Sequence, residues 1–239
     1  MNIKTETMGS ITGNVASELN NGLSSARLVV FVALALWLGL VSFLASQGAF
    51  VGSANSPPLP IFFGVTIPLA VFLAAYFRWK SFRDFILGAD LRFVAAIEAW
   101  RWGGLGFLSL YANGILPGLF ALPAGLGDMA IGITAPWIVI SLVRNPLFAG
   151  SRRFVIWNIL GITDFVVAVS TATLSSGAFP GITALMGNVT TSPMTRLPLV
   201  LIPAFMVPFF TMLHLTALFQ ARQLARTRRV ERLETLRSR

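Results

Sequence analysis

The distribution of charge constrains this chain most strongly, because long segments carry almost no charged side chains. None lies between Val29 and Tyr76, and Asp128 is the only one between Arg101 and Arg144. Charged residues make up 11% of the chain, whereas soluble domains carry about 25%. Apolar stretches of about 20 residues cross a bilayer as helices. The sequence therefore predicts an all-α, polytopic membrane protein.

The apolar runs predict six transmembrane helices. The expected spans are residues 27–48, 58–77, 94–115, 119–143, 154–176 and 197–220. An amphipathic segment between the second and third spans is expected to form an interfacial helix. Residues 1–26 are expected to be a mobile cytoplasmic N-terminus, residues 27–220 the transmembrane bundle, and residues 221–239 a basic cytoplasmic tail.

The basic residues indicate an orientation in the membrane. The second-to-third loop, the fourth-to-fifth loop and the tail are basic, whereas Arg196 is the only basic residue in the other loops. The positive-inside rule then places both termini in the cytoplasm. The net charge of +9 is explained by this distribution, so nucleic acid is not an expected partner.

The tail carries a second membrane signal. Val230, Leu233 and Leu236 fall on one side of a helix among several Arg residues. Basic residues beside a membrane are attracted to anionic lipid. We therefore expect the tail to bind anionic lipid on the inner leaflet, with a solvated tail as the alternative.

Two acids interrupt the apolar spans. At 1.5 Å per residue, Asp128 lies roughly 14 Å from one membrane edge and Asp164 roughly 15 Å from the other, so both fall near the bilayer centre. Each belongs to the pattern Gly-x-x-Asp-x-x-x-small-x-hydroxyl; the residues are Gly125, Asp128, Gly132 and Thr134 in one span, and Gly161, Asp164, Ala168 and Ser170 in the next. The match is either a small inverted repeat or chance similarity between helices rich in small residues.

Small residues share a helical face with each acid. In the fourth span the stripe is Ala121, Gly125, Asp128, Gly132 and Ala135, and in the fifth it is Trp157, Gly161, Asp164, Ala168 and Thr171. Such stripes let helices approach closely in lipid, and acids avoid lipid exposure. We therefore expect the fourth and fifth spans to pack along these stripes, with Asp128 facing Asp164.

Three other ionisable residues could join these acids. Arg101 is either buried, if its span starts near Leu91, or at the cytoplasmic interface, if it starts near Glu98. Glu98 can pair with Arg101 at i,i+3. His214 is expected nearer the inner membrane edge than the acids. The residues expected to support the site are Gly125, Gly132, Gly161, Thr134, Asn158, Pro203 and Pro208, with the two prolines expected to kink the last span.

The segment Gly125–Asp128 resembles the GxGD element of intramembrane aspartyl proteases, the group that includes presenilin and signal peptide peptidase. The resemblance implies that Asp128 and Asp164 act as a dyad that activates water. In that family, however, the second Asp precedes the GxGD helix and follows a Tyr, whereas Asp164 comes later and follows Thr163. Over its whole length the chain is similar to bacterial inner-membrane proteins with LPAGLGD-like and LHL-like stretches. This resemblance implies a location in the bacterial inner membrane, and it carries no information on activity.

The sequence thus leads to one principal hypothesis and two alternatives. The principal hypothesis is binding or transport of a small solute or cation at a protonatable Asp128–Asp164 pair near the membrane midplane. The alternatives are an intramembrane hydrolase and an accessory subunit in which the acids only pair with Arg101. We expect no cofactor and no metal, since the chain has no Cys and one His. The oligomeric state is left open.

Overall fold

The computed structural model describes residues 28–52 and 56–237, and these contain helices but no strand. The expected N-terminal segment, residues 1–26, lies outside the described residues. The chain divides after Val41 into two compact units. One helix, Leu28–Ser46, begins in the smaller unit and ends in the larger unit. Apart from this helix, all features described below belong to the larger unit.

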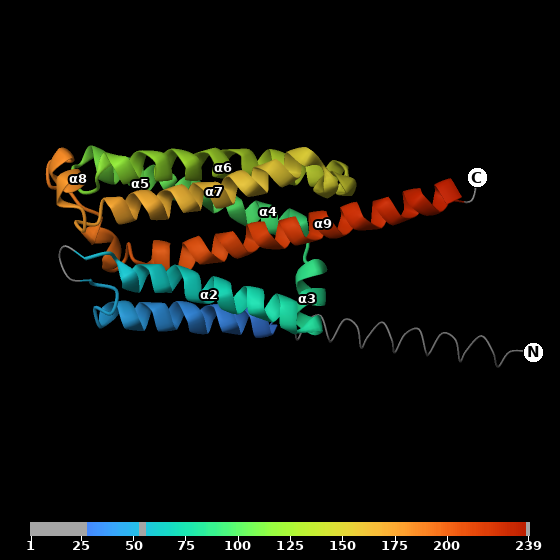
Figure 1. Ribbon diagram of the computed structural model, residues 1–239, viewed down its shortest axis with the longest axis horizontal. Coiled ribbons are helices and arrows are strands. Elements are labelled where there is room, and N and C mark those ends of the chain that lie inside the picture. The colour runs from blue at the N-terminus through green and yellow to red at the C-terminus, as the bar shows by residue number, and fades with distance from the viewer. Residues whose placement is uncertain (1–27, 53–55, 238–239) are drawn as a thin grey trace, which may run out of the picture. The chain divides into compact units, whose positions relative to one another are not determined.

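The larger unit contains four long helices joined by shorter helical segments. Its elements are α2 (Leu59–Arg78), α3 (Lys80–Leu87), α4 (Leu91–Ile97), the 3₁₀ helix η1 (Glu98–Gly104), α5 (Leu105–Ala112), α6 (Gly118–Arg144), the 3₁₀ helix η2 (Pro146–Gly150), α7 (Arg152–Leu174), α8 (Pro180–Leu185), the 3₁₀ helix η3 (Ser192–Thr195), the π-helix η4 (Ile202–Met206) and α9 (Val207–Arg237). In Figure 1, α2, α6, α7 and α9 run roughly along one direction. Among them, α6 packs against α7, and α9 packs against both α7 and α2.

Five described helices are long and apolar enough to cross a membrane. They are Leu28–Ser46, Leu59–Arg78, Gly118–Arg144, Arg152–Leu174 and Ile202–Arg228. Large apolar side chains are exposed on the outer faces of α6 and α7, among them Leu126, Trp137 and Val166. A soluble protein rarely exposes such continuous apolar surface. The helices therefore indicate a membrane protein.

The expected third span is not a single regular helix. It is divided into α4, η1 and α5, and each of these segments has only seven or eight residues. α4 begins at Leu91, where Asp90 caps the helix by accepting a hydrogen bond from the Arg92 backbone N–H at 2.9 Å. The Arg92 side chain also binds the Asp90 carboxylate, which lowers the pKa of Asp90. This capped start leaves ten residues of helical chain before Arg101.

Close packing accompanies the 3₁₀ winding of η1. The whole α4–η1–α5 segment lies against α6. A Cβ atom added at Gly132 would lie 2.4 Å from the Trp102 backbone nitrogen, and one at Gly104 would lie 2.7 Å from the Gly125 carbonyl oxygen. Neither position has room for a side chain, so glycine allows the two backbones to touch. This contact holds η1 against the middle of α6.

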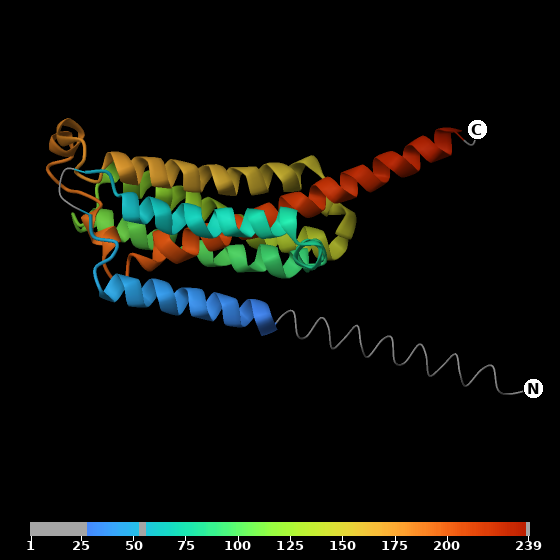
Figure 2. The same ribbon diagram turned by 60° about the horizontal axis from the view of Figure 1, so that its bottom comes forward.

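The two ends of the larger unit differ in composition. At one end lie α3, the α6–α7 connection and the C-terminal part of α9, which together carry most of its Arg and Lys residues (Figure 1). α3 runs across the direction of α2 and is seen nearly end-on in Figure 2. The Gln220 amide donates hydrogen bonds to the carbonyls of Ile86 and Ala89, each at 2.9 Å, and so fastens α9 to the α3–α4 connection.

The last long helix begins later than the sequence suggested. Residues 197–200 form a turn, and a π-helical segment, Ile202–Met206, precedes α9. Pro203 and Pro208, which were expected to kink this span, lie within and just after the π-helical segment. Their missing N–H groups disturb the regular i→i−4 pattern, which accounts for the local irregularity. α9 then continues without interruption to Arg237, although the side chains of Val230, Leu233 and Leu236 lie outside the described residues.

Two apolar clusters lie on either side of a polar layer. One contains Leu142, Phe154 and Ala217 near the basic end, and the other contains Phe107, Phe120 and Met194 near the opposite end. Along α6 and α7 the two acids fall between these clusters. The core thus isolates a small group of polar side chains from both ends of the bundle.

Candidate functional site

Arg101 forms the centre of the polar layer. It comes from η1 and is only 2% exposed. Its Nε atom donates to Oδ1 of Asp128 at 2.7 Å, and its Nη2 atom donates to Oδ2 of Asp164 at 2.5 Å. One guanidinium thus bridges carboxylates from α6 and α7. Hydrogen bonds between ionised partners are among the strongest in proteins, particularly away from water.

The remaining faces of the Arg101 guanidinium are also occupied. Nη1 lies 2.8 Å from Nε2 of His214 and donates to the Gly161 carbonyl at 3.3 Å. The Phe165 ring lies against the guanidinium, with its centroid 3.9 Å from the Cζ atom. Arg101 therefore connects η1 to α6, α7 and α9 by polar contacts and by a cation–π contact.

The tautomer of His214 follows from its neighbours. Asn158 donates its amide hydrogen to the Phe154 carbonyl at 2.9 Å, which turns its side-chain oxygen toward His214. That oxygen lies 2.9 Å from Nδ1, which must carry the proton and donate. Nε2 is then free to accept from Arg101. The network assigns a neutral imidazole that acts as an acceptor for the guanidinium.

Glu98 is the least satisfied member of the group. It is 1% exposed, and neither of its carboxyl oxygens has a hydrogen-bond partner among the described residues. Oε2 lies 3.7 Å from Nη1 of Arg101 and 3.3 Å from Nε2 of His214. A buried polar group without a hydrogen bond is costly, so its retention calls for an explanation. Glu98 is placed so that a small movement of Arg101 would give it a partner.

The structure brings all five expected ionisable residues together. They are Glu98, Arg101, Asp128, Asp164 and His214. Of the two placements left open for Arg101, the structure has the buried one. His214, which was expected nearer the inner membrane edge than the acids, contacts the same guanidinium as they do.

The glycines of the two stripes do not face each other, although α6 and α7 meet at other residues of the stripes, among them Ala135 and Trp157. Gly125 and Gly132 of α6 face α5 and η1, where added Cβ atoms would meet Leu108 and Trp102. Gly161 of α7 makes room for the His214 ring of α9, since an added Cβ would lie 2.1 Å from Nε2. The glycines therefore bring η1 and α9 close to the acids, while larger residues of the same stripes join α6 to α7.

The other expected supporting residues have structural partners. The Thr134 hydroxyl accepts a hydrogen bond from the Trp157 ring N–H at 2.8 Å, which joins α6 to α7. Asn158 orients His214, and Pro203 lines a cavity beside the acids. Pro208 is fully buried at the start of α9. Prediction from the sequence missed Gly127, whose missing side chain leaves space for the Asp164 carboxylate, and Phe165 against Arg101.

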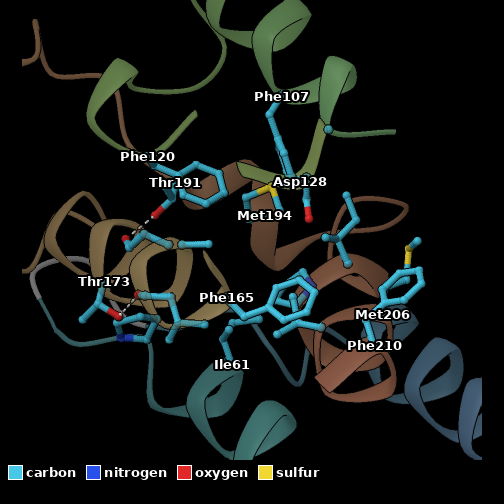
Figure 3. A pocket seen from close by; sticks show the side chains of 18 of the residues that line it. Ile61, Phe107, Phe120, Asp128, Phe165, Thr173, Thr191, Met194, Met206 and Phe210 are labelled. Atoms are coloured by element: carbon cyan, nitrogen blue, oxygen red, sulfur yellow. Dashed lines mark hydrogen bonds between the residues drawn. The ribbon is translucent and has the colours of Figure 1, made fainter. Parts of the chain in front are cut away.

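A cavity of about 150 Å³ ends at the charged group. Arg101 and Asp128 line its inner end, whereas Asp164 does not line it. Figure 3 shows the Asp128 carboxyl end directed into the space beside Phe107 and Met194, with the Phe165 ring across from it. The Asp128 side chain retains 15% exposure although its ion pair is formed. One part of this carboxylate is therefore accessible from the cavity.

Sequence patterns offered little sign of this cavity. Its walls come from separate elements, among them α2, η1, α7 and η4. Thr191 and Thr173 lie toward its outer end, where their hydroxyls donate to the carbonyls of Ala172 and Val169. Among the described residues, no group of three or more His, Cys, Asp or Glu side chains could hold a metal ion.

Comparison with known proteins places the chain in a family. A family model described as a domain of unknown function, DUF8737, matches residues 58–222, which include the whole charged group and the cavity. The chain belongs to this family. No curated protein and no solved structure matches the chain.

Proposed function

We propose that this DUF8737 protein binds a small solute in the cavity and carries it across the bacterial inner membrane, with Asp128 and Asp164 exchanging protons during the cycle. One observation carries the proposal: a buried guanidinium bridges both acids at the closed end of a cavity. Ionisable groups inside a membrane are costly and usually serve transport or proton movement. Asp128 can reach a solute from the cavity while Asp164 remains with Arg101.

The geometry favours binding over hydrolysis. In an aspartyl protease the two carboxyls share a proton and activate a water between them. Here the Arg101 guanidinium binds both Asp128 and Asp164. The guanidinium contacts both acids at the position where that chemistry requires a water. The ion pairs therefore support a binding site better than a catalytic dyad.

An accessory, purely structural role is the second candidate, and the contacts of Arg101 favour it. Its guanidinium contacts Asp128, Asp164, Gly161, His214 and Phe165, so the group stabilises the packing of four elements without any ligand. Transport requires that one of these contacts can open. The accessible side of Asp128 supports such an opening, and so does Glu98, whose carboxyl oxygens make no hydrogen bond among the described residues.

Our topology has six spans, with α4, η1 and α5 together forming the third and α3 lying at the interface. The packing of this broken segment along α6 supports a full crossing. The charge asymmetry of the loops supports cytoplasmic termini. Reporter fusions after Thr191 and after Asn55, which lies outside the described residues, should read as external. Fusions after Gly150 and at the C-terminus should read as cytoplasmic; an external signal at Gly150 would refute this topology.

We also assign the C-terminal part of α9 to the surface of the inner leaflet. Arg222, Arg226 and Arg228 are exposed on this helix, beyond its apolar part. Each Arg beside anionic lipid contributes about 1 kcal/mol. A peptide of residues 221–239 should bind vesicles containing phosphatidylserine at low salt and leave neutral vesicles unbound. Equal binding to both kinds of vesicle would contradict an electrostatic role.

The transport proposal is tested in proteoliposomes that contain a pH-sensitive dye. Small organic cations, anions and neutral solutes are added in turn, and one class should change the internal pH faster than in protein-free vesicles. Asp128→Asn and Asp164→Asn should remove this difference, while Asp84→Asn, an exposed acid on α3, should retain it. If no solute produces a protein-dependent pH change, the transport proposal fails and the accessory role remains.

A further inference from the structure

The cavity restricts the size of its occupant. Its volume of about 150 Å³ matches that of a cavity that holds one benzene molecule, and is well below the roughly 300 Å³ at which pockets for drug-sized ligands begin. One aromatic ring or a short branched alkyl group therefore fills it. A nucleotide or peptide is too large to fit inside it.

The walls restrict the polarity of that occupant. Most lining side chains are apolar, and six of them are aromatic: Phe62, Trp100, Phe107, Phe120, Phe165 and Phe210. The hydroxyls of the three lining threonines, Thr173, Thr191 and Thr195, already donate to backbone carbonyls. An apolar body is thus favoured along most of the cavity, and aromatic faces also attract a cation.

The charged residues at the inner end of the cavity restrict the charge of its occupant. Three carboxyl groups, from Glu98, Asp128 and Asp164, lie within 4 Å of the single Arg101 guanidinium. Asp128 is the one that lines the cavity. A second positive charge there would complement the excess of acids, whereas an anion would meet Asp128 directly.

The exposed residues at the edge of the cavity indicate how a ligand reaches it. The lining includes Phe62 of α2 and Trp100 and Gly103 of η1, and all three are exposed on the outer surface of the bundle. Trp100 is 76% exposed. In a membrane this surface faces lipid, so a molecule dissolved in the bilayer reaches the cavity without crossing a polar barrier.

We propose that the cavity binds a small lipophilic ammonium ion, with its apolar body between the aromatic side chains and its ammonium group on Asp128. This assignment rests on the proposed transport function and names its substrate class. The protonated amine donates to Asp128 and replaces the Nε–H of Arg101. Arg101 keeps Asp164 through Nη2 and moves toward Glu98, whose Oε2 already lies 3.7 Å from Nη1. Glu98 then gains the hydrogen bond that it lacks without ligand.

The exchange leaves each acid with a hydrogen-bond donor. Asp128 loses one charged donor and gains another, while Glu98 gains a hydrogen bond from Nη1 in place of the long bond of 3.3 Å that Nη1 makes to the Gly161 carbonyl. No proton transfer is needed for binding itself. Glu98 is thus a positioning residue that acts through Arg101, and Asp128 is the residue that touches the ligand.

Benzylammonium tests the proposal, with ethylbenzene and phenylacetate as neutral and anionic analogues of similar size. Binding is measured by calorimetry on the full-length protein in lipid nanodiscs, with empty nanodiscs subtracted. Benzylammonium should bind about tenfold or more tightly than either analogue, because a hydrogen bond to a charged group is worth at least the 1.4 kcal/mol that corresponds to a factor of about ten. Equal affinity for ethylbenzene, or preference for phenylacetate, would overturn the assignment of charge.

Variants separate the roles of the residues. Asp128→Asn should weaken benzylammonium binding about tenfold or more but leave ethylbenzene binding unchanged. Glu98→Gln should weaken benzylammonium binding less, with the same selectivity, and the exposed control Asp84→Asn should change nothing. Val169→Phe, which fills the cavity without changing its charge, should abolish binding of both benzylammonium and ethylbenzene. Benzylammonium binding that survives Val169→Phe in a folded protein would place the ligand elsewhere.

Failure of this inference is distinguishable from failure of the transport proposal. If phenylacetate or another class drives the pH change in proteoliposomes while benzylammonium does not bind, transport stands and the ammonium assignment is wrong. If benzylammonium binds through Asp128 but no solute changes the internal pH, the site is a receptor site and transport is wrong.

Discussion

Two segments of similar sequence, Gly125–Asp128 in α6 and Gly161–Asp164 in α7, have different surroundings in the structure. Asp128 lines the cavity and binds Nε of Arg101, whereas Asp164 lies outside the cavity lining and binds Nη2. Gly125 packs against α5 and η1, while Gly161 packs against His214 of α9. The matching pattern places both acids at one level, but their roles are set by the elements that pack beside them.

The largest effect should come from removing the cation that the two segments share. Arg101→Met leaves Asp128 and Asp164 buried without a partner and should destabilise the protein by about 3–5 kcal/mol. The triple variant that adds Asp128→Asn and Asp164→Asn should recover much of this loss. Both are measured by thermal unfolding in detergent micelles. A stable Arg101→Met protein would show that the ion pairs do not hold α6 and α7 together.

The next comparison changes one acid at a time. Asp164→Asn should cost about 2–3 kcal/mol, because its short hydrogen bond to Arg101 is shielded from the cavity. Asp128→Asn should cost about 1–2 kcal/mol, since this residue lines the cavity, where water can replace the lost hydrogen bond, and it should weaken binding of the ammonium ligand about tenfold or more. Unfolding and ligand titration of both variants are compared. Equal effects on stability and binding would mean that the two segments are equivalent.

The glycines of the two segments allow a smaller test. Gly161→Ala forces a methyl group against the buried His214 ring and should cost about 1–3 kcal/mol. Gly106→Ala in α5, where nothing lies within 4 Å of an added Cβ, should be neutral or stabilising. Thermal unfolding of the pair measures the difference. If Gly161→Ala is tolerated as well as Gly106→Ala, His214 is not held against α7.

The smallest effect concerns the hydroxyl residues that complete the two patterns. Thr134→Val removes the acceptor for the Trp157 ring N–H and should cost about 1 kcal/mol or slightly more. Ser170 is exposed, so Ser170→Ala should change stability by no more than about 0.5 kcal/mol. The shift in the unfolding midpoint of each variant measures this difference. A larger loss for Ser170→Ala would show that the pattern extends further than the contacts indicate.

Much of the fold could be predicted from the sequence. The second, fourth and fifth spans agree with α2, α6 and α7 within two residues at each end, because lipid requires an unbroken apolar helix of a certain length. The broken third span could not be predicted, since its 3₁₀ segment packs against α6 through Gly104, a contact between residues that are distant in the sequence. The late start of the last span likewise depends on a π-helical segment at Pro203.

For the candidate site, the sequence by itself determined which residues are ionisable and that they must avoid lipid, because the cost of burying a charge in a bilayer does not depend on the fold. The tertiary structure alone decided their partners. Arg101 lies between the acids because η1 touches α6 at glycine positions, and His214 reaches it because Gly161 leaves space in α7. Such contacts join residues far apart in the chain, so no local sequence pattern specifies them. They are specified by the packing of several helices around one guanidinium.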